Sequence, residues 1–242
     1  MAISTKNSQY DIQADGLKKS FGNFEVLRGV DLHIKRGEFF TLFGPNGAGK
    51  TTLIKLLATL TDPTSGNLHV SGFDVKKEVN NIRSTIGVIS HDPYLYDNLS
   101  ALENITFFGT LYGLDDIDNR ARCVIKQVGL ERRMNDIVRT FSRGMKQRLS
   151  VARAIVHDPK ILLLDEPYTG LDQNGSQIFG EMLSDLKSNK RTILMTTHNI
   201  DEGLDLSDRI GILSKGKIVL DCPKSEIQRS SFKDLYISKV ED

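Results

Sequence analysis

Residues Gly44-Pro45-Asn46-Gly47-Ala48-Gly49-Lys50-Thr51 match the phosphate-binding pattern G-x-x-x-x-G-K-[ST] along their whole length. The apolar residues 39–43 before this stretch predict a buried strand, and residues 52–58 after it carry apolar side chains at helical spacing. In such a strand–loop–helix unit, backbone N–H groups and the positive end of the helix dipole face one point, where an anion can bind. A plain glycine turn is the alternative, and the flanking strand and helix favour a nucleoside triphosphate site.

The pattern also assigns chemistry to particular side chains. Lys50 is expected to reach the β- and γ-phosphates, and the Thr51 hydroxyl is expected to ligate Mg²⁺. The other loop residues expected to contact the nucleotide are Gly44, Pro45, Asn46, Gly47, Ala48, Gly49 and Thr52. The ligands predicted from this stretch are therefore ATP and Mg²⁺.

The composition is that of an ordinary soluble globular protein, because 39% of the 242 residues are hydrophobic and 26% are charged. That length suffices for one domain with an inserted lobe or for two small domains. The net charge of +1 gives no indication of nucleic-acid binding, and we expect no nucleic-acid partner. Two widely separated cysteines, Cys123 and Cys222, indicate a reducing compartment without disulfide bonds.

No membrane-targeting segment is expected. Residues 1–15 lack the apolar core of a signal peptide. No apolar run approaches the roughly 20 residues that a membrane-spanning helix needs. If the protein acts at a membrane, we expect it to dock onto a protein that is embedded there.

The order of apolar runs and turn residues predicts an α/β core that is interrupted by a mostly helical lobe. Strands are expected at 26–34, through Val70 and Phe73, and at 86–90, 161–164, 192–197 and 210–213, with a final hairpin turn at 215–217. Helices are expected from the capping box 100–103 to Gly113, near 118–128, and from Ser142 onward. The predicted boundaries are 1–91 and 159–242 for the core and 92–158 for the lobe.

Polar residues with catalytic potential follow two of the predicted strands. Asp165 and Glu166 come directly after 161–164, and His198 follows 192–197. Ligands of open α/β sheets bind at the carboxyl ends of strands, where these residues and the phosphate loop would meet. Asp165 is expected to hold Mg²⁺, and Glu166 is expected to accept a proton from the attacking water. His198 is expected to bond a γ-phosphate oxygen and to orient Glu166. The alternatives are a solvated acidic turn and a structural histidine.

A second possible anion site begins in the stretch Phe141-Ser142-Arg143-Gly144-Met145. Ser142 is a good helix N-cap and apolar side chains follow it at helical spacing, so an ordinary amphipathic helix is one interpretation. Gly144 in the first turn, however, lowers helix stability by up to about 1 kcal/mol relative to alanine. Free N–H groups, a hydroxyl and a glycine together favour an anion site. Because one phosphate rarely needs two such sites, we favour a head-to-tail pair in which this site covers the partner's ATP.

Taken in order, these motifs resemble the nucleotide-binding subunit of an ABC (ATP-binding cassette) transporter over essentially the whole chain. Residues 44–51 match the Walker A motif, 161–166 the Walker B motif, 142–147 the signature motif and 170–172 the D-loop. The resemblance implies the ABC ATPase fold, which is a P-loop NTPase core with an N-terminal antiparallel β subdomain and an inserted helical subdomain. It also implies that His198 is the switch histidine and that Phe21 stacks on adenine.

The same resemblance implies how the protein works. Two cassettes, identical or homologous, would sandwich two Mg–ATP, and their closing and opening would drive an integral membrane permease at the cytoplasmic face of the cell membrane. The partner's ATP would be contacted by Ser142, Arg143, Gly144 and Met145. Tyr94, Leu95 and Tyr96 lie where the family receives a segment of the permease, although packing inside the lobe is an equal alternative.

Two stretches depart from the family pattern. The usual signature is Leu-Ser-Gly-Gly-Gln, whereas this chain has Phe141, Arg143 and Met145 at the first, third and fifth positions. Ser90-His91-Asp92 stands where a glutamine usually touches Mg²⁺, so any metal contact there is expected through water or not at all. Both stretches, with residues 99–104, resemble the haem-exporter type of cassette associated with cytochrome c maturation. Only this likeness favours export over import.

Other functions fit the sequence less well. A soluble ABC ATPase of translation would carry two cassettes and a charged linker, and one of DNA repair would carry long coiled coils; we see neither pattern here. A single-cassette ATPase that serves an assembly scaffold, such as that of iron–sulfur cluster biogenesis, stays the main alternative. A P-loop kinase or GTPase would explain Lys50 and Thr51 but not Ser142 or His198. The transported substrate is not readable, because the permease selects it.

Overall fold

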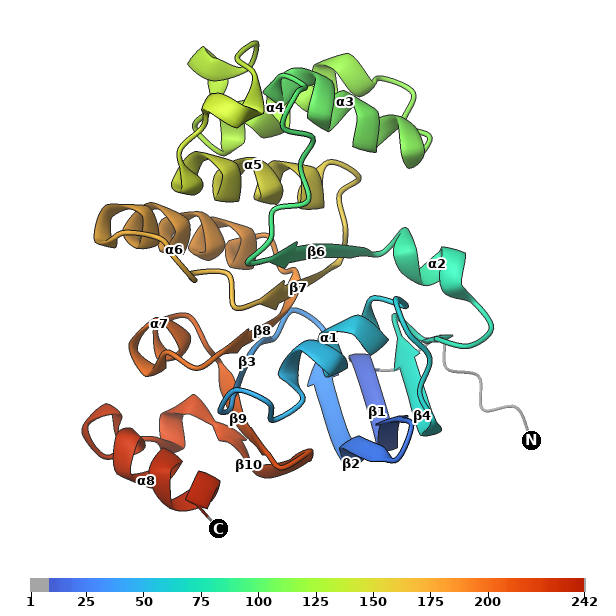
Figure 1. The fold of residues 1–242 in the computed structure, drawn as a ribbon, viewed down its shortest axis with the longest axis vertical. Coiled ribbons are helices and arrows are strands. Elements are labelled where there is room, and N and C mark those ends of the chain that lie inside the picture. Colours follow the sequence, from blue (N-terminus) through green and yellow to red (C-terminus); the bar gives the residue numbers. More distant parts are fainter. Residues whose placement is uncertain (1–8, 242) are drawn as a thin grey trace.

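The computed structural model describes residues 9–241. The expectation that residues 1–15 form no signal peptide therefore lies partly outside the described residues, because it includes residues 1–8. Two β-sheets form the frame of the molecule (Figure 1). The smaller sheet has the order β2-β1-β4-β5, and its strands pair antiparallel. These strands are β1 (Tyr10–Phe21), β2 (Phe24–Lys35), β4 (Ser65–Val70) and β5 (Phe73–Asp74).

The larger sheet has the strand order β10-β9-β3-β8-β7-β6, in which only β10 runs antiparallel to its neighbour. Its strands are β3 (Phe39–Phe43), β6 (Ile86–Ser90), β7 (Ile161–Asp165), β8 (Thr192–Thr197), β9 (Arg209–Ser214) and β10 (Lys217–Pro223). Strands β3, β7 and β8 are buried along their whole length. Because parallel strands of this kind are covered on both faces, they appear in the sequence as continuous apolar runs, and these runs were predicted correctly.

Helices cover the larger sheet, and α3, α4 and α5 form a separate layer at the top of Figure 1. The helices are α1 (Lys50–Leu57), α2 (Val79–Arg83), α3 (Ala101–Leu111), α4 (Ile117–Gln127), α5 (Arg143–Ile155), α6 (Gln173–Ser188), α7 (Ile200–Asp205) and α8 (Arg229–Glu241). The predicted capping box of α3 is present, because Glu103 N donates to Ser100 Oγ (3.2 Å) and Ser100 N donates to Glu103 Oε2 (2.7 Å). The arrangement confirms the α/β fold class and the ABC ATPase fold.

The helical layer shares its apolar core with the larger sheet. One cluster of buried side chains joins Leu149 of α5, Leu162 of β7 and Phe179 of α6. A second cluster joins Leu53 of α1 and Leu163 of β7 to the smaller sheet. Alternate residues of β7 thus face opposite layers. The lobe boundaries at 92 and 158 stay a prediction, since the core is continuous across them.

Helix α6 was absent from the expected elements, although its signals are present in the sequence. Asp172 is its N-cap, and Asp172 Oδ1 accepts a hydrogen bond from Gly175 N (2.7 Å). Its buried residues Phe179, Met182, Leu183 and Leu186 follow the i, i+3, i+4, i+7 spacing of an amphipathic helix. Helix α8 was also absent from the expected elements, although Phe232, Leu235, Tyr236 and Val240 pack on the core at the i, i+3, i+4, i+8 spacing of an amphipathic helix.

Candidate nucleotide site and second anion site

The phosphate loop and the predicted catalytic residues meet at one edge of the larger sheet. In the parallel register Phe43 pairs with Thr197, and Thr196 pairs with Asp165. Asp165 also pairs with Ser90 at the end of β6. The loops after β3, β6, β7 and β8 therefore leave the sheet side by side at its carboxyl edge, where open α/β sheets bind ligands.

Two glycines allow the phosphate loop to take its shape. Gly49, the N-cap of α1, has a φ of 110°, and a Cβ there would lie 2.7 Å from Leu27 Cδ2. A Cβ on Gly44 would lie 2.4 Å from the carbonyl oxygen of Leu213, so a side chain there would push β9 away. The α1 N-cap makes no side-chain hydrogen bond, which leaves the first N–H groups of the helix to an anion.

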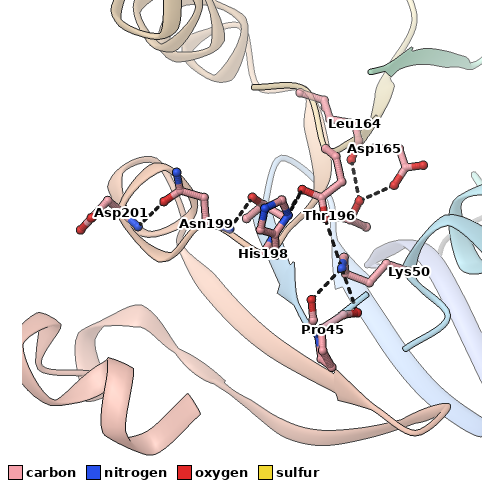
Figure 2. A network of polar contacts seen from close by, with 11 residues as sticks. Pro45, Lys50, Leu164, Asp165, Thr196, His198, Asn199 and Asp201 are labelled. Carbon is pink, nitrogen blue, oxygen red and sulfur yellow. Dashed lines mark hydrogen bonds and ion pairs between the residues drawn. The ribbon is translucent and has the colours of Figure 1, made fainter. Parts of the chain in front are cut away.

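Lys50 is almost fully buried, with 6% of its surface exposed. Its Nζ donates to the carbonyl oxygens of Gly44 (2.6 Å) and Pro45 (3.2 Å), and it lies 3.2 Å from Glu166 Oε1. Figure 2 shows Lys50 beside Pro45, facing the strand end that carries His198. A buried ammonium group needs such acceptors, and the charged oxygens of a triphosphate would be stronger ones.

Glu166 lies between Lys50 and His198. Its φ of 51° is uncommon for a residue other than glycine, and its side chain is 17% exposed. Glu166 Oε2 accepts from His198 Nδ1 (2.8 Å) and from His198 N (3.3 Å), whereas Oε1 is enclosed without a hydrogen bond and has only the ion pair with Lys50. Burial raises the pKa of the neighbouring Glu202 carboxyl, an effect that His198 opposes and Glu166 reinforces. His198 thus holds one oxygen of the Glu166 carboxylate, and Lys50 holds the other through the ion pair.

The residues predicted to hold Mg²⁺ suit a hard cation. Asp165 is buried at the end of β7, and its Oδ1 accepts a hydrogen bond from Thr196 Oγ1 (2.7 Å). Thr51 is exposed and lines the same cavity as Glu166, whose enclosed Oε1 has no hydrogen bond. Within residues 9–241, no group of three His, Cys, Asp or Glu side chains could hold a metal. The site fits Mg²⁺, which binds through one or two protein oxygens together with phosphates and water.

The cavity at the phosphate loop has a volume of about 310 Å³, and the structure places an unexpected aromatic residue in its wall. The loop residues that line it are Pro45, Asn46, Gly47, Gly49, Lys50, Thr51 and Thr52, while Gly44 and Ala48 are buried beneath. Phe24, which is 66% exposed, lines the cavity, whereas Phe21 does not. Phe21 is 54% exposed and lies under the Lys19 ammonium, 4.7 Å from its ring centre. Phe24 was missed because the resemblance pointed to Phe21, its partner across the hairpin.

The predicted second anion site is at the start of α5. Ser142 is the N-cap, and its Oγ accepts a hydrogen bond from Met145 N (3.3 Å). Met145 packs partly against the core, whereas Ser142 and Arg143 are exposed. These residues and Gly144 line a separate cavity of about 270 Å³ with D-loop residues such as Gly170. This cavity shares no lining residue with the one at the phosphate loop, so the two anion sites of one chain face different spaces.

His91 and the aromatic residues after it lie beside the catalytic edge. His91 N donates to the carbonyl oxygen of Asp165 (3.1 Å), and its exposed side chain lines a cavity of about 580 Å³ with Tyr94 and Leu95. Tyr94 and Tyr96 are exposed, while Leu95 packs against the core cluster. Packing inside the lobe thus describes Leu95, and in part Tyr96, whose ring contacts Phe107 and Phe108 of α3.

A glycine loop at a helix N-terminus, a buried lysine and a strand-end pair of carboxylates define the class of P-loop nucleoside triphosphatases. The family model for ABC transporters matches residues 27–169 of this chain. The linearmycin resistance ATP-binding protein LnrL of Bacillus subtilis is 36% identical over 218 residues, which are 89% of this chain and 70% of LnrL. The Nod factor export ATP-binding protein I of Cupriavidus pinatubonensis is 37% identical over 207 residues, which are 85% of this chain and 64% of that protein.

Among solved structures, the dimeric, post-hydrolysis state of the ATP-binding cassette MJ0796 with ADP and Pi has a TM-score of 0.80. It is 27% identical in sequence, and the match covers 88% of this chain and 98% of that one. The chain belongs to the ABC transporter family, as an ATP-binding subunit that couples ATP hydrolysis to transport. Within residues 9–241, no helix combines the length and the apolarity needed to cross a bilayer.

Proposed function

We propose that this chain is the ATPase subunit of an exporter, in which two cassettes bind two Mg–ATP head to tail and move an integral membrane permease. The observation that carries the pairing is Gly144. Its φ is not in the left-handed region, and a Cβ added there would meet nothing within 4 Å. Nothing in the described part of the chain therefore requires glycine at this helical position, where alanine is more stable by up to about 1 kcal/mol. Glycine at this position is explained if a phosphate of the partner's ATP approaches the backbone closely there.

The proposed mechanism of hydrolysis uses the residues at the carboxyl edge of the sheet. Thr51 and Asp165 would hold Mg²⁺, which would neutralise charge on the phosphates when bound. Lys50 would exchange the Gly44 and Pro45 carbonyls for phosphate oxygens and leave its ion pair with Glu166. Glu166 would then accept the proton of the attacking water while His198 Nδ1 keeps its carboxylate in place.

The proposed partner is a membrane permease on the cytoplasmic side. Exposed aromatic side chains are favoured at interfaces, and Tyr94 and Tyr96 provide two of them near the junction of lobe and core. The Tyr96 ring meets Phe107 edge to face and stacks with Phe108, which extends the aromatic surface along α3. Peripheral attachment to the cytoplasmic face of the membrane would follow from this contact.

Export is proposed from the relatives, whose names refer to linearmycin resistance and Nod factor export. Neither name concerns haem, so the haem-exporter type stays a prediction from three short stretches of sequence. The iron–sulfur scaffold ATPase, the alternative from the sequence alone, has no observation in its favour, and it is kept as the second candidate only as an outcome of the test.

One experiment tests the pairing and the partner. A tagged Glu166→Gln variant is extracted from membranes in mild detergent with Mg–ATP, and the co-purifying proteins are identified. We expect a polytopic membrane protein, whereas recovery of soluble scaffold proteins alone would favour the second candidate. The exposed Glu131→Gln is the matched control for loss of one carboxylate.

A second experiment tests the observation on Gly144. In the Glu166→Gln background, Gly144→Ala is expected to abolish the Mg–ATP-dependent dimer measured by light scattering, because the new methyl group occupies the approach of the partner's phosphate. The same change should leave the melting temperature equal or higher. A dimer of unchanged affinity would refute the proposed anion site.

A further inference from the structure

Arg143, which occupies a position where the family usually has glycine, makes a specific contact inside this chain. Its Nε and Nη2 donate to one acceptor, the carbonyl oxygen of Thr169, at 3.1 and 2.8 Å. The contact spans 26 residues and joins the first turn of α5 to the D-loop segment that precedes α6. An exposed arginine gives up side-chain freedom in such a contact, so the forked pair of bonds holds a defined geometry.

The Thr169 carbonyl belongs to a short segment that begins at the candidate catalytic base. Thr169 N donates to the carbonyl oxygen of Glu166 (3.2 Å), so hydrogen bonds run from Arg143 through Thr169 to Glu166. Glu166 has a φ of 51°, which in a residue other than glycine persists only where surrounding contacts support it. Gly170, with a φ of 76°, adopts the left-handed conformation without strain. Helix α5 gives a second support, because the buried Gln147 Nε2 donates to the Pro167 carbonyl (2.9 Å).

Gly170 leaves the space that the arginine occupies. A Cβ on Gly170 would lie 2.4 Å from Arg143 Nε and 2.5 Å from its Cζ. The guanidinium group is the flexible end of a side chain, so an alanine at position 170 would displace it from Thr169. Because the φ of Gly170 is 76°, the alanine would also strain the backbone. The contact can therefore be broken from either side, by removing the arginine or by filling the space.

We propose that Arg143 is a positioning residue that couples the two nucleotide sites of the dimer. It stands beside Ser142 in the anion site that would cover the partner's ATP, and it holds the segment that shapes Glu166, the base for the chain's own ATP. Binding at one site thereby favours the active geometry at the other, which makes hydrolysis cooperative. This inference rests on the proposed head-to-tail pairing.

The test compares Arg143→Gly, Gly170→Ala and the double variant, with the exposed Arg132→Gly as the control for loss of charge. ATP hydrolysis is measured against ATP concentration. We expect a wild-type Hill coefficient above 1 that falls to about 1 in both single variants, with kcat lowered about fivefold. The double variant should lose little more than Gly170→Ala alone, because both changes remove the same contact and the backbone strain comes from the alanine in each case. Arg132→Gly should match the wild type.

Dimerisation separates this inference from the proposed function. In the Glu166→Gln background, Arg143→Gly should still form the Mg–ATP-dependent dimer, because the Ser142 hydroxyl and the N–H groups of α5 remain. If the Glu166→Gln variant that keeps Arg143 forms no dimer, the proposed pairing itself is refuted. A dimer that Arg143→Gly abolishes would show that the guanidinium binds the partner's phosphate instead of positioning Glu166, and would overturn the inference. An unchanged Hill coefficient, losses that add fully in the double variant, or a non-cooperative wild-type dimer would overturn it as well.

Discussion

The two helix N-termini that carry anion-binding features, those of α1 and α5, differ in what surrounds them. The start of α1 is enclosed by a buried lysine, a carboxylate–imidazole pair and the wall that includes Phe24. The start of α5 is exposed, and its serine hydroxyl bonds only the helix it caps. The α1 site has the groups needed to bind ATP within one chain, whereas the cavity at the α5 site has hydroxyl and N–H donors but no lysine or histidine in its lining.

This difference indicates that the α1 and α5 sites have separate roles in ATP binding and in turnover. Residues at α1 should determine how tightly a single chain binds ATP, and residues at α5 should matter only when a partner presents its nucleotide. Substitutions whose effects on ATP binding and on ATP hydrolysis are measured separately therefore test this difference.

The largest effect is expected at the base. Glu166→Gln removes the proton acceptor and should lower turnover by roughly 10² to 10⁴. ATP affinity should be retained or rise, because the substitution also removes the ion pair that holds Lys50 at 3.2 Å. Steady-state phosphate release and equilibrium ATP binding measure the two quantities. Hydrolysis at the normal rate would show that another group is the base.

Lys50→Ala should weaken ATP binding itself by about tenfold to a hundredfold, because a buried ammonium that could bond phosphate oxygens is lost. Isothermal titration with ATP on the isolated chain measures this loss. Lys55→Ala, on the exposed side of the same helix, is the control and should bind normally. Equal affinities of the two variants would contradict the role assigned to the phosphate loop.

If the Ser142 hydroxyl bonds the partner's phosphate as proposed, Ser142→Ala should lower turnover about tenfold while ATP binding to the single chain stays unchanged. Loss of the helix cap also lowers the free energy of unfolding by about 1 kcal/mol. Ser100→Ala provides a matched control, because it removes the N-cap of α3 at similar cost in stability. The hypothesis fails if both variants lose the same activity at equal stability.

The smallest effect is expected at the aromatic wall. If Phe24 contacts the nucleotide base as its place in the cavity suggests, Phe24→Ala should weaken ATP binding about fivefold, the magnitude of one aromatic contact. Phe21→Ala tests the residue that the family resemblance favours. The variant with the larger loss of affinity for ATP, but not for inorganic triphosphate, identifies the stacking residue.

Much of the architecture could be predicted from local patterns. The buried strands β3, β7, β8 and β9 are continuous apolar runs, and the N-cap of α5 and the capping box of α3 use short-range chemistry that the sequence states directly. Helices α6 and α8 were missed although their core-facing apolar residues have helical spacing, such as Phe232, Leu235, Tyr236 and Val240 in α8. The position of the site could be predicted as well, because the phosphate loop, the carboxylate pair and His198 each follow a strand of the larger sheet.

The sequence by itself determined that a phosphate loop, a pair of carboxylates and a histidine follow strands, because glycine spacing and apolar runs are local properties of the chain. The contacts between these residues depend on the tertiary structure. Lys50 bonds its own loop and pairs with Glu166. Phe24, and not Phe21, lines the cavity, and Arg143 bonds the Thr169 carbonyl. Those contacts join residues from 5 to 116 positions apart. Their geometry depends on how sheets and helices pack, which no local pattern encodes.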